Sequence, residues 1–472
     1  MNLPVDFIKR TSDLLGEEQF AAFCEALSKE SPVSIRVNRL KTDAVPEGGH
    51  RVPWCDMGYY LSSRPAFTFD PLFHAGCYYV QEASSMFLEQ VLKQYVHEPV
   101  VMLDLCAAPG GKSTLARSVL PEGSLLVANE VMRNRVQVLA ENVTKWGHPD
   151  TVVLNNDPAD FAQLGELFDV ILTDVPCSGE GMFRKDPVAV EEWSKENVTL
   201  CWQRQRRIVS DIWRCLKPGG LLIYSTCTYN REENEDNVAW IAEELGAEML
   251  PVEVQPEWSI TGNLTGKDFP VYRFLSHRTE GEGLFMAVLR KSGESEEDIP
   301  AFRQRKEKKA KGGKGKDKMP VLPKEVKDWL VSSDQYAWMM EQNRITAFSA
   351  IYQSVYENLR ERMRMVCAGV QVAEIKGRDL IPSHALAMSV CRNEKAFPSV
   401  EVSYEQAIAY LRKEAFALEA DAPRGYILIR YKGKALGFVK NIGNRANNLY
   451  PQEWRIRSGY LPEQVSLVLG NS

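Results

Sequence analysis

Apolar and polar residues follow different periods in different parts of the chain, and the first part predicts a mixed α/β module over residues 1–98. Amphipathic stretches near 5–15 and 17–28 predict two short helices. Residues 34–38 alternate between polar and apolar side chains, which predicts a strand. Residues 81–91 predict a helix that leads into the next region.

The pattern changes over residues 99–291, where short apolar runs alternate with amphipathic helices. Residues 131–146 and 199–216 carry the clearest helical periods. Strands that alternate with helices predict a Rossmann-like parallel sheet covered on both faces, so we assign the chain to the α/β class. The predicted strands are Val100–Cys106, Ser124–Asn129, Thr151–Leu154, Phe168–Asp174, Gly220–Ser225 and Leu284–Leu289.

Three further segments follow the predicted sheet. Residues 292–320 are dominated by Gly, Lys and Glu, which predicts a flexible basic linker. Residues 321–394 predict a small intermediate α/β domain. Residues 395–472 predict a compact α+β module, in which apolar residues alternate on both sides of Lys432-Gly433-Lys434 as in a β-hairpin.

Composition and cysteine usage limit the functional classes. The chain has 472 residues, 44% of them hydrophobic and 25% charged, which is typical of a folded protein of several domains. No apolar run reaches the roughly 18 residues of a membrane span, and no signal sequence is evident. The ten cysteines include no Cys-x-x-Cys pair. We therefore expect a cytoplasmic protein with reduced thiols, no metal and no membrane partner, and we expect a monomer.

Positive charge gathers in two places, although the whole chain has a net charge of −6. Residues 301–318 and residues 424–457 each carry a net charge of +7. Local basic segments on an acidic chain indicate contact with phosphates. The alternative for residues 301–318 is a solvated linker. The alternative for residues 424–457 is a lysine-rich surface that has no binding partner.

A loop of small residues follows the first predicted strand and precedes a helix. Such a loop lets backbone N–H groups approach a ligand closely. Acidic residues end the next three strands: Glu130, Asp157 and Asp174. Glu130 could hold ribose hydroxyls, and Asp157 could contact an adenine amino group. The pattern therefore predicts a nucleoside cofactor. The predicted loop comprises Cys106, Ala107, Ala108, Pro109, Gly110, Gly111 and Lys112.

Two other nucleotide-binding motifs do not fit this loop. A P-loop needs a glycine five residues before Gly111, and Cys106 stands there. The Gly-x-Gly-x-x-Gly spacing of a Rossmann dehydrogenase is also absent. A tight turn with only a structural role is the remaining alternative for the loop taken alone.

Two cysteines fall directly after the fourth and fifth strands, Cys177 in Pro176-Cys177-Ser178-Gly179 and Cys227 in Ser225-Thr226-Cys227-Thr228. Buried structural thiols are the alternative, but both are expected beside the cofactor and near Asp174. Carbon 5 of cytosine is a poor nucleophile. A thiolate that adds to carbon 6 makes carbon 5 able to attack an electrophilic methyl group.

The chain resembles the RNA cytosine-5 methyltransferase family of the Nop/Sun type. The resemblance lies in the cofactor loop, in the two cysteine motifs, and in the segments Ser34-Ile35-Arg36-Val37-Asn38 and Gln81-Glu82-Ala83-Ser84-Ser85. The chain looks most like the bacterial RsmF-type enzymes that act on small-subunit (16S) rRNA. The resemblance covers most of residues 1–290. It implies S-adenosylmethionine as cofactor, bound by the 106–112 loop with Glu130, Asp157 and Asp174.

The resemblance also implies roles for the catalytic residues. Cys227 would attack carbon 6, Cys177 would assist release, and Asp174 would complete the site. By analogy with DNA cytosine methyltransferases, Cys177 would attack instead. The resemblance further implies that residues 395–472 are similar to a PUA domain that binds RNA. Methylation of tRNA and a non-catalytic role in ribosome assembly stay open as alternatives.

Aromatic and basic residues outside the sheet are the candidates for holding the RNA strand while the target base leaves its stack. Lys185, which follows the Cys177 motif, could lower a thiol pKa or touch phosphate, or could be a plain surface lysine. The predicted RNA contacts are Arg36, Asn38, Lys185, Lys432, Lys434, Lys440 and Arg445.

Overall fold

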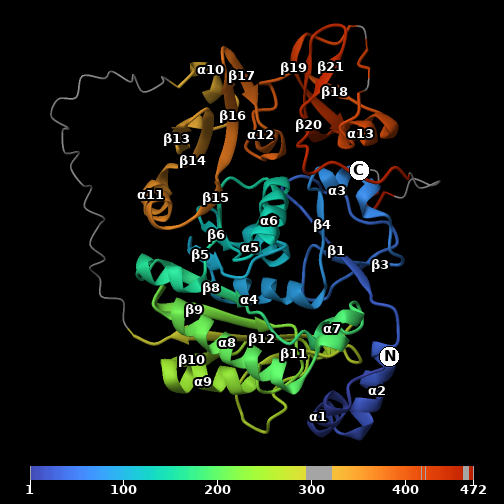
Figure 1. Ribbon diagram of the computed structural model, residues 1–472, viewed down its shortest axis with the longest axis vertical. Helices are drawn as coiled ribbons and strands as arrows, with labels where there is room; N and C mark the ends of the chain where they lie inside the picture. Colours follow the sequence, from blue (N-terminus) through green and yellow to red (C-terminus); the bar gives the residue numbers. More distant parts are fainter. Residues whose placement is uncertain (1, 294–321, 416, 420, 461–466, 471–472) are drawn as a thin grey trace, which may run out of the picture.

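A computed structural model describes residues 2–293, 322–415, 417–419, 421–460 and 467–470. The predicted basic run at 301–318 lies outside these residues. The described chain forms four sheets, of which the largest has nine strands (Figure 1). No helix in the described part of the chain is long and apolar enough to cross a membrane.

The N-terminal module has the predicted mixed α/β character. Its four strands pair in the order β2-β3-β1-β4, all antiparallel. The two predicted helices form, and Phe7 and Phe23 bury their apolar faces against Phe183 and Trp193 of the catalytic domain. The elements are α1 (Val5–Leu15), α2 (Glu17–Leu27), β1 (Val33–Val37), β2 (His50–Arg51), β3 (Gly58–Leu61), α3 (Pro71–His74) and β4 (Tyr78–Val80).

The helix predicted over residues 81–91 is wrong in its bounds. The Glu82 carboxylate accepts hydrogen bonds from the backbone N–H groups of Ser84 and Ser85, at 2.9 and 3.0 Å. This local bond competes with helix formation and produces a 3₁₀ turn first. The α-helix, α4 (Leu88–Tyr95), begins seven residues later than predicted.

The predicted Rossmann-like sheet is confirmed. Its strands run in the order β10-β12-β9-β8-β5-β6-β7-β15, with β11 paired to β12. The strands β7, β6, β5, β8 and β9 are parallel, so their carboxyl ends meet at one edge of the sheet. The strands are β5 (Val101–Asp104), β6 (Leu125–Asn129), β7 (Thr151–Leu154), β8 (Phe168–Asp174), β9 (Leu216–Thr226), β10 (Ala247–Leu250), β11 (Tyr272–Phe274) and β12 (Leu284–Lys291).

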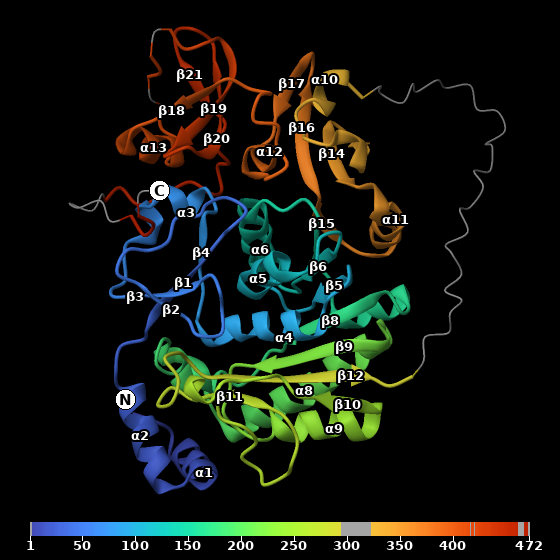
Figure 2. The ribbon, with the colours of Figure 1, turned by 180° about the vertical axis from the view of Figure 1, so that it is seen from behind.

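Helices cover both faces of this sheet, because each parallel strand returns through a helical crossover. Leu88 and Leu115 bring α4 and α5 onto one face, and Ile208 and Val238 bring α8 and α9 onto the other. Figure 2 shows the two layers from behind. The helices are α5 (Gly111–Val119), α6 (Arg133–Trp146), α7 (Pro187–Glu192), α8 (Lys195–Trp213) and α9 (Glu235–Leu245).

The segment predicted as a separate intermediate domain contributes to the catalytic sheet. Its strand β15 (Met365–Ala368) pairs antiparallel with β7 at the sheet edge. The rest of the segment forms a sheet in the order β13-β14-β16-β17. Its elements are α10 (Lys324–Lys327), β13 (Tyr336–Glu341), β14 (Arg344–Ser349), α11 (Gln353–Arg362), β16 (Val370–Lys376), β17 (Asp379–Pro382) and α12 (His384–Met388).

The last module contains the predicted hairpin, made by β19 and β20. Its core is continuous with the N-terminal module, since Tyr404 donates to the Phe69 carbonyl at 3.0 Å and Val468 N–H donates to Asp70 at 3.1 Å. Figure 1 shows this module beside α3. Its elements are β18 (Ser399–Glu401), α13 (Tyr404–Leu411), β19 (Gly425–Tyr431), β20 (Lys434–Asn441) and β21 (Ala446–Asn448).

Candidate active site

The predicted cofactor loop connects β5 to the N-terminus of α5. Gly110 precedes the helix with φ of 115°, a conformation that favours glycine. Two side chains of helix α6 form hydrogen bonds with the loop backbone. Arg135 donates to the Ala108 carbonyl at 2.7 Å, and Asn142 donates to the Pro109 carbonyl at 2.8 Å. The loop is therefore fixed by side chains before any ligand arrives.

The predicted acidic residues differ in their surroundings. Glu130 is buried, and its carboxylate accepts from the Met132 N–H at 2.9 Å. Asp157 is exposed and caps the following turn by accepting from the Ala159 N–H at 3.1 Å. Asp174 pairs with Lys112 of the loop at 2.8 Å. Burial opposes the Lys112 charge, but Asp174 outweighs it and holds the pKa of Lys112 above its ordinary value.

Two buried oxygens at this edge have no hydrogen-bond partner among the described residues, Oγ of Ser225 in β9 and Oδ1 of Asp104 at the end of β5. Asp104 is the one beside the cofactor loop. The other carboxylate oxygen of Asp104 accepts from Ser113 Oγ at 2.6 Å. Burial raises the pKa of Asp104 to about 7, and the Asp174 charge adds to this shift. An unpartnered carboxylate oxygen beside a glycine loop fits a ligand with a cationic group, such as the ammonium and sulfonium of S-adenosylmethionine.

The two predicted cysteines meet at the same sheet edge. Their loops follow β8 and β9, which lie side by side, and Asp174 is in register with Ser225. The Sγ atoms of Cys177 and Cys227 are 3.0 Å apart. The Cys227 N–H also donates to Cys177 Sγ at 3.3 Å. The pairing of parallel strands thus brings together two thiols that are 50 residues apart in the sequence.

Cys227 acts electrostatically on two neighbouring groups. The hydrogen bond to Cys227 and burial hold the pKa of Cys177 well above its usual range, so Cys177 keeps its proton. The interaction between Cys227 and Lys112 favours the charged form of Lys112.

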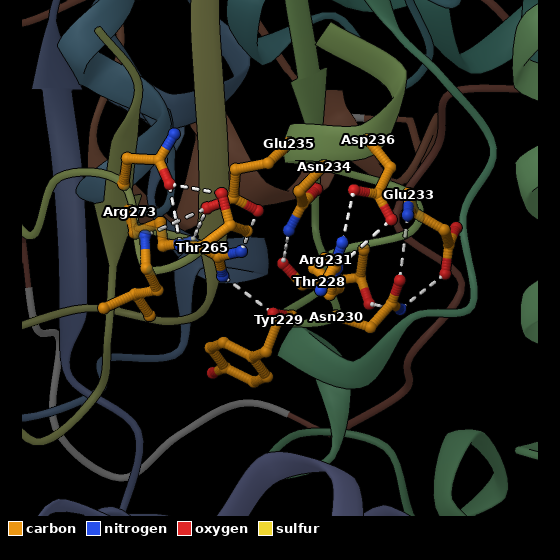
Figure 3. A network of polar contacts seen from close by, with 12 residues as sticks. Thr228, Tyr229, Asn230, Arg231, Glu233, Asn234, Glu235, Asp236, Thr265 and Arg273 are labelled. Carbon is orange, nitrogen blue, oxygen red and sulfur yellow. Dashed lines mark hydrogen bonds and ion pairs between the residues drawn. The ribbon is translucent and has the colours of Figure 1, made fainter. Parts of the chain in front are cut away.

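A buried polar network holds the loop that follows β9 (Figure 3). Asn234 donates to the Thr228 carbonyl at 3.0 Å. Arg273 pairs with Glu235, and both side chains are about 1% exposed. Arg273 also donates to the Tyr229 carbonyl at 2.7 Å. These contacts fix the backbone directly after Cys227, and the prediction from sequence does not include them.

The structure requires a correction at two of the predicted RNA contacts. Arg36 and Asn38 are 2% and 0% exposed. Arg36 donates to Gln81 at 2.8 Å and to Thr114 at 2.6 Å, and it stacks on the Trp146 ring. Asn38 donates to the carbonyl at the end of α6 at 3.0 Å. Both join the N-terminal module to the catalytic domain, and neither presents a surface to RNA.

The other predicted RNA contacts lie outside the core. Lys185 lies 3.6 Å from the Glu282 carboxylate. Lys440 pairs with Asp379 at 2.6 Å. Lys432, Lys434 and Arg445 lie on or beside the hairpin of the last module, with Lys432 and Arg445 exposed and Lys434 partly exposed.

Comparison with known proteins identifies the family. Residues 90–290 match the family described as 16S rRNA methyltransferase RsmB/F. Residues 3–83 match the N-terminal domain of 16S rRNA methyltransferase RsmF, and residues 397–456 match the RsmF PUA domain. A Klebsiella pneumoniae protein named ribosomal RNA small subunit methyltransferase F is 30% identical over 95% of this chain and 94% of its own length. The chain belongs to the RsmF family.

A further relative and two solved structures are also similar to this chain. A protein of the same name from Vibrio cholerae is 29% identical over 96% of this chain and 98% of its own length. A methyltransferase homologue from Pyrococcus horikoshii has a solved structure that is 26% identical, with a TM-score of 0.50 over 61% of this chain and all of that one. The P. horikoshii NSun6 structure with SFG, an S-adenosylmethionine analogue, shares the fold at 20% identity, with a TM-score of 0.53 over 62% of this chain and 99% of that one.

Proposed function

We propose that this member of the RsmF family transfers a methyl group from S-adenosylmethionine to carbon 5 of a cytosine in 16S rRNA. The observation that carries the proposal is the 3.0 Å approach of the Cys177 and Cys227 sulfur atoms at the carboxyl ends of β8 and β9. A non-catalytic RNA-binding protein would have no use for two thiols beside the cofactor loop. The names of the relatives support small-subunit rRNA as the substrate.

The first step belongs to Cys227. Its thiolate adds to carbon 6 of the cytosine, and the electron pair of the carbon 5–carbon 6 double bond becomes available at carbon 5. S-adenosylmethionine, when held by the 106–112 loop with Glu130, Asp157 and Asp174, supplies the electrophilic methyl group. Asp174 contributes by keeping Lys112 charged through their 2.8 Å ion pair.

Release requires a base that accepts the proton on carbon 5, and solvent water serves as this base because Cys177 keeps its own proton. The electron pair of the carbon 5–hydrogen bond then restores the ring double bond and expels the Cys227 thiolate from carbon 6. Cys177 is adjacent, with its Sγ 3.0 Å from the departing sulfur, and its S–H assists by donating a hydrogen bond to the leaving thiolate. The two cysteines therefore have separate roles, attack for Cys227 and release for Cys177.

A trapping assay tests the chemistry and the substrate together. The protein is mixed with S-adenosylmethionine and 16S rRNA that carries 5-fluorocytidine, and the RNA-linked peptide is identified by mass spectrometry. Fluorine on carbon 5 blocks the release step, so a working enzyme stays attached through Cys227. Assembled small subunits and tRNA are tested in parallel, because an adduct on tRNA alone would contradict the proposed substrate.

Cysteine variants separate the two roles on unmodified RNA. Cys227→Ala should abolish methylation, whereas Cys177→Ala should accumulate a covalent RNA complex. Cys24→Ala, a partly buried thiol on α2, is the matched control and should behave like the original protein. Turnover by Cys227→Ala together with an inactive Cys177→Ala that traps no RNA would reverse the roles.

A further inference from the structure

The two cysteine loops are tied to each other by buried carboxylates. The Cys177 loop comprises residues 175–182, and the Cys227 loop comprises residues 227–235. Glu180 of the first loop is 1% exposed. Its carboxylate accepts from Thr228 Oγ1 at 2.6 Å, from the Tyr229 N–H at 2.7 Å and from the Asn230 N–H at 2.9 Å. A side chain of the Cys177 loop therefore fixes the backbone that follows Cys227.

Glu233 makes the reciprocal connection from the Cys227 loop. It is 0% exposed, and its carboxylate accepts from the N–H of Ser178, the residue after Cys177, at 3.1 Å. Gln205 Nε2 donates to the same carboxylate at 2.6 Å and to the Pro176 carbonyl at 3.0 Å. Each cysteine thus has a backbone neighbour that is held by the carboxylate of the opposite loop.

Asn230 connects the two carboxylates. Its Nδ2 lies 3.1 Å from Glu180 Oε1 and 2.8 Å from Glu233 Oε1. Figure 3 shows Asn230 beside Glu233 in the loop after β9. The hydrogen bonds described for both carboxylates come from neutral groups, so the pair concentrates negative charge next to the thiols. Burial, and then the Glu180 charge, raise the pKa of Glu233 to about 7.

This charge acts on the thiols beside it. The groups that act electrostatically on Cys177 include Cys227, Glu233 and Tyr224. The Glu233 charge opposes ionisation of Cys177. Burial, and then the Glu233 charge, raise the pKa of Cys201, on α8, to about 11.

We propose that Glu180 and Glu233 are positioning residues that hold the two sulfur atoms at their close approach, and that the Glu233 carboxylate keeps the proton on Cys177. The proposal rests on the proposed function only for the use of the two thiols in catalysis. The ionisation of Cys177 is a property of the free protein and can be measured without RNA or cofactor.

The test measures alkylation of each cysteine by iodoacetamide as a function of pH in the full-length protein, with mass spectrometry of the peptides. Only the thiolate reacts, so each cysteine reports its own ionisation. In the original protein Cys177 should react only at a pH well above that of an ordinary thiol. In Glu233→Gln the Cys177 midpoint should move to lower pH. Its alkylation at about pH 9, where Glu233 is charged in the original protein, should be roughly tenfold faster, equivalent to about one pKa unit.

Two further variants separate charge from structure. Glu89→Gln removes another buried carboxylate, which accepts from Cys55 and pairs with Lys93, and it should leave the Cys177 midpoint unchanged. Glu233→Asp keeps the charge at the site, so the Cys177 midpoint should stay close to that of the original protein even if thermal stability falls. If Glu233→Gln does not fold, a full shift of the Cys177 midpoint in Glu233→Asp would still overturn the proposal.

The result that overturns the proposal is a Cys177 midpoint that is the same in Glu233→Gln and in the original protein. An equal shift in Glu89→Gln, or a full shift in Glu233→Asp, would overturn it as well. Failure to trap 5-fluorocytidine RNA in the original protein would refute the proposed function and leave the alkylation profiles as they are. The two failures are therefore distinguishable.

Discussion

Arg36 offers a sharp test of the fold, because the sequence suggests an RNA contact and the structure buries it. The Arg36 guanidinium donates short hydrogen bonds to Gln81 and Thr114, at 2.8 and 2.6 Å, and stacks 4.3 Å above the Trp146 ring. A hydrogen bond from a charged donor contributes about 1.5–3 kcal/mol, and a buried cation–π contact about 2 kcal/mol.

The cost of burying the charge offsets part of this stabilisation. Burial lowers the pKa of Arg36 to about 10, which shows that the surroundings oppose the charge. Methionine fills a similar space without a charge, so Arg36→Met should lose about 3 kcal/mol of folding free energy. For a catalytic unit of this size the melting temperature should fall by roughly 6–12 °C, measured by calorimetry.

Arg39→Met is the matched control, since Arg39 is 48% exposed and pairs with Asp43 on the surface. This variant should cost less than about 1 kcal/mol. The alternative, that Arg36 contacts RNA phosphate, is tested by measuring RNA affinity as a function of salt concentration. If Arg36 contacts phosphate instead, Arg36→Met should reduce the salt slope by about 0.7–0.9 and leave the melting temperature unchanged, which would refute the reasoning.

Three other predictions concern the site and the last module. Affinity for S-adenosylmethionine, measured by calorimetry, should rise between about pH 6 and pH 8. The reason is that Asp104, with a pKa of about 7, is neutral below that pH and charged above it. The variant Asp104→Asn should lack this rise. Hydrogen peroxide should join Cys177 and Cys227, whose sulfurs are 3.0 Å apart, with loss of two thiols and formation of two waters per peroxide. Dithiothreitol should then restore methylation by reducing the disulfide. If peroxide inactivates the protein while both cysteines still react as free thiols, the prediction of a disulfide is contradicted. Replacing Lys434 and Arg445 together by Gln should lower the salt slope of RNA binding by about 1–2, while cofactor affinity stays constant.

The structure also changes how the last module should be tested. Deletion of residues 395–472 is the simplest way to remove the predicted RNA-binding module. Their core, however, is shared with the N-terminal module through contacts such as Tyr404 with Phe69. Deletion would expose apolar surface on both modules, so substitutions on the hairpin surface isolate RNA binding more cleanly.

Hydrophobic patterning predicts the catalytic sheet well because buried parallel strands are short continuous apolar runs. Strands β7 and β8 have the predicted bounds, and the hairpin of the last module forms where the alternation predicts it. The placement of Asp174, Cys177 and Cys227 follows from the same pattern, since each comes at or directly after the end of a predicted strand.

The sequence by itself therefore determined most strands of the central sheet, the class of fold and the types of reactive group at one sheet edge, because these depend on short-range periodicity. Tertiary packing alone decided which side chains meet. The Arg36 strand alternates as if one face were exposed, but α5 and Trp146 cover that face. Strand β15 joins β7 across about 200 residues of sequence, and Glu180 and Glu233 reach across to the opposite cysteine loops. No local pattern encodes such contacts, because their partners are chosen by burial and by the need to satisfy polar groups within the folded core.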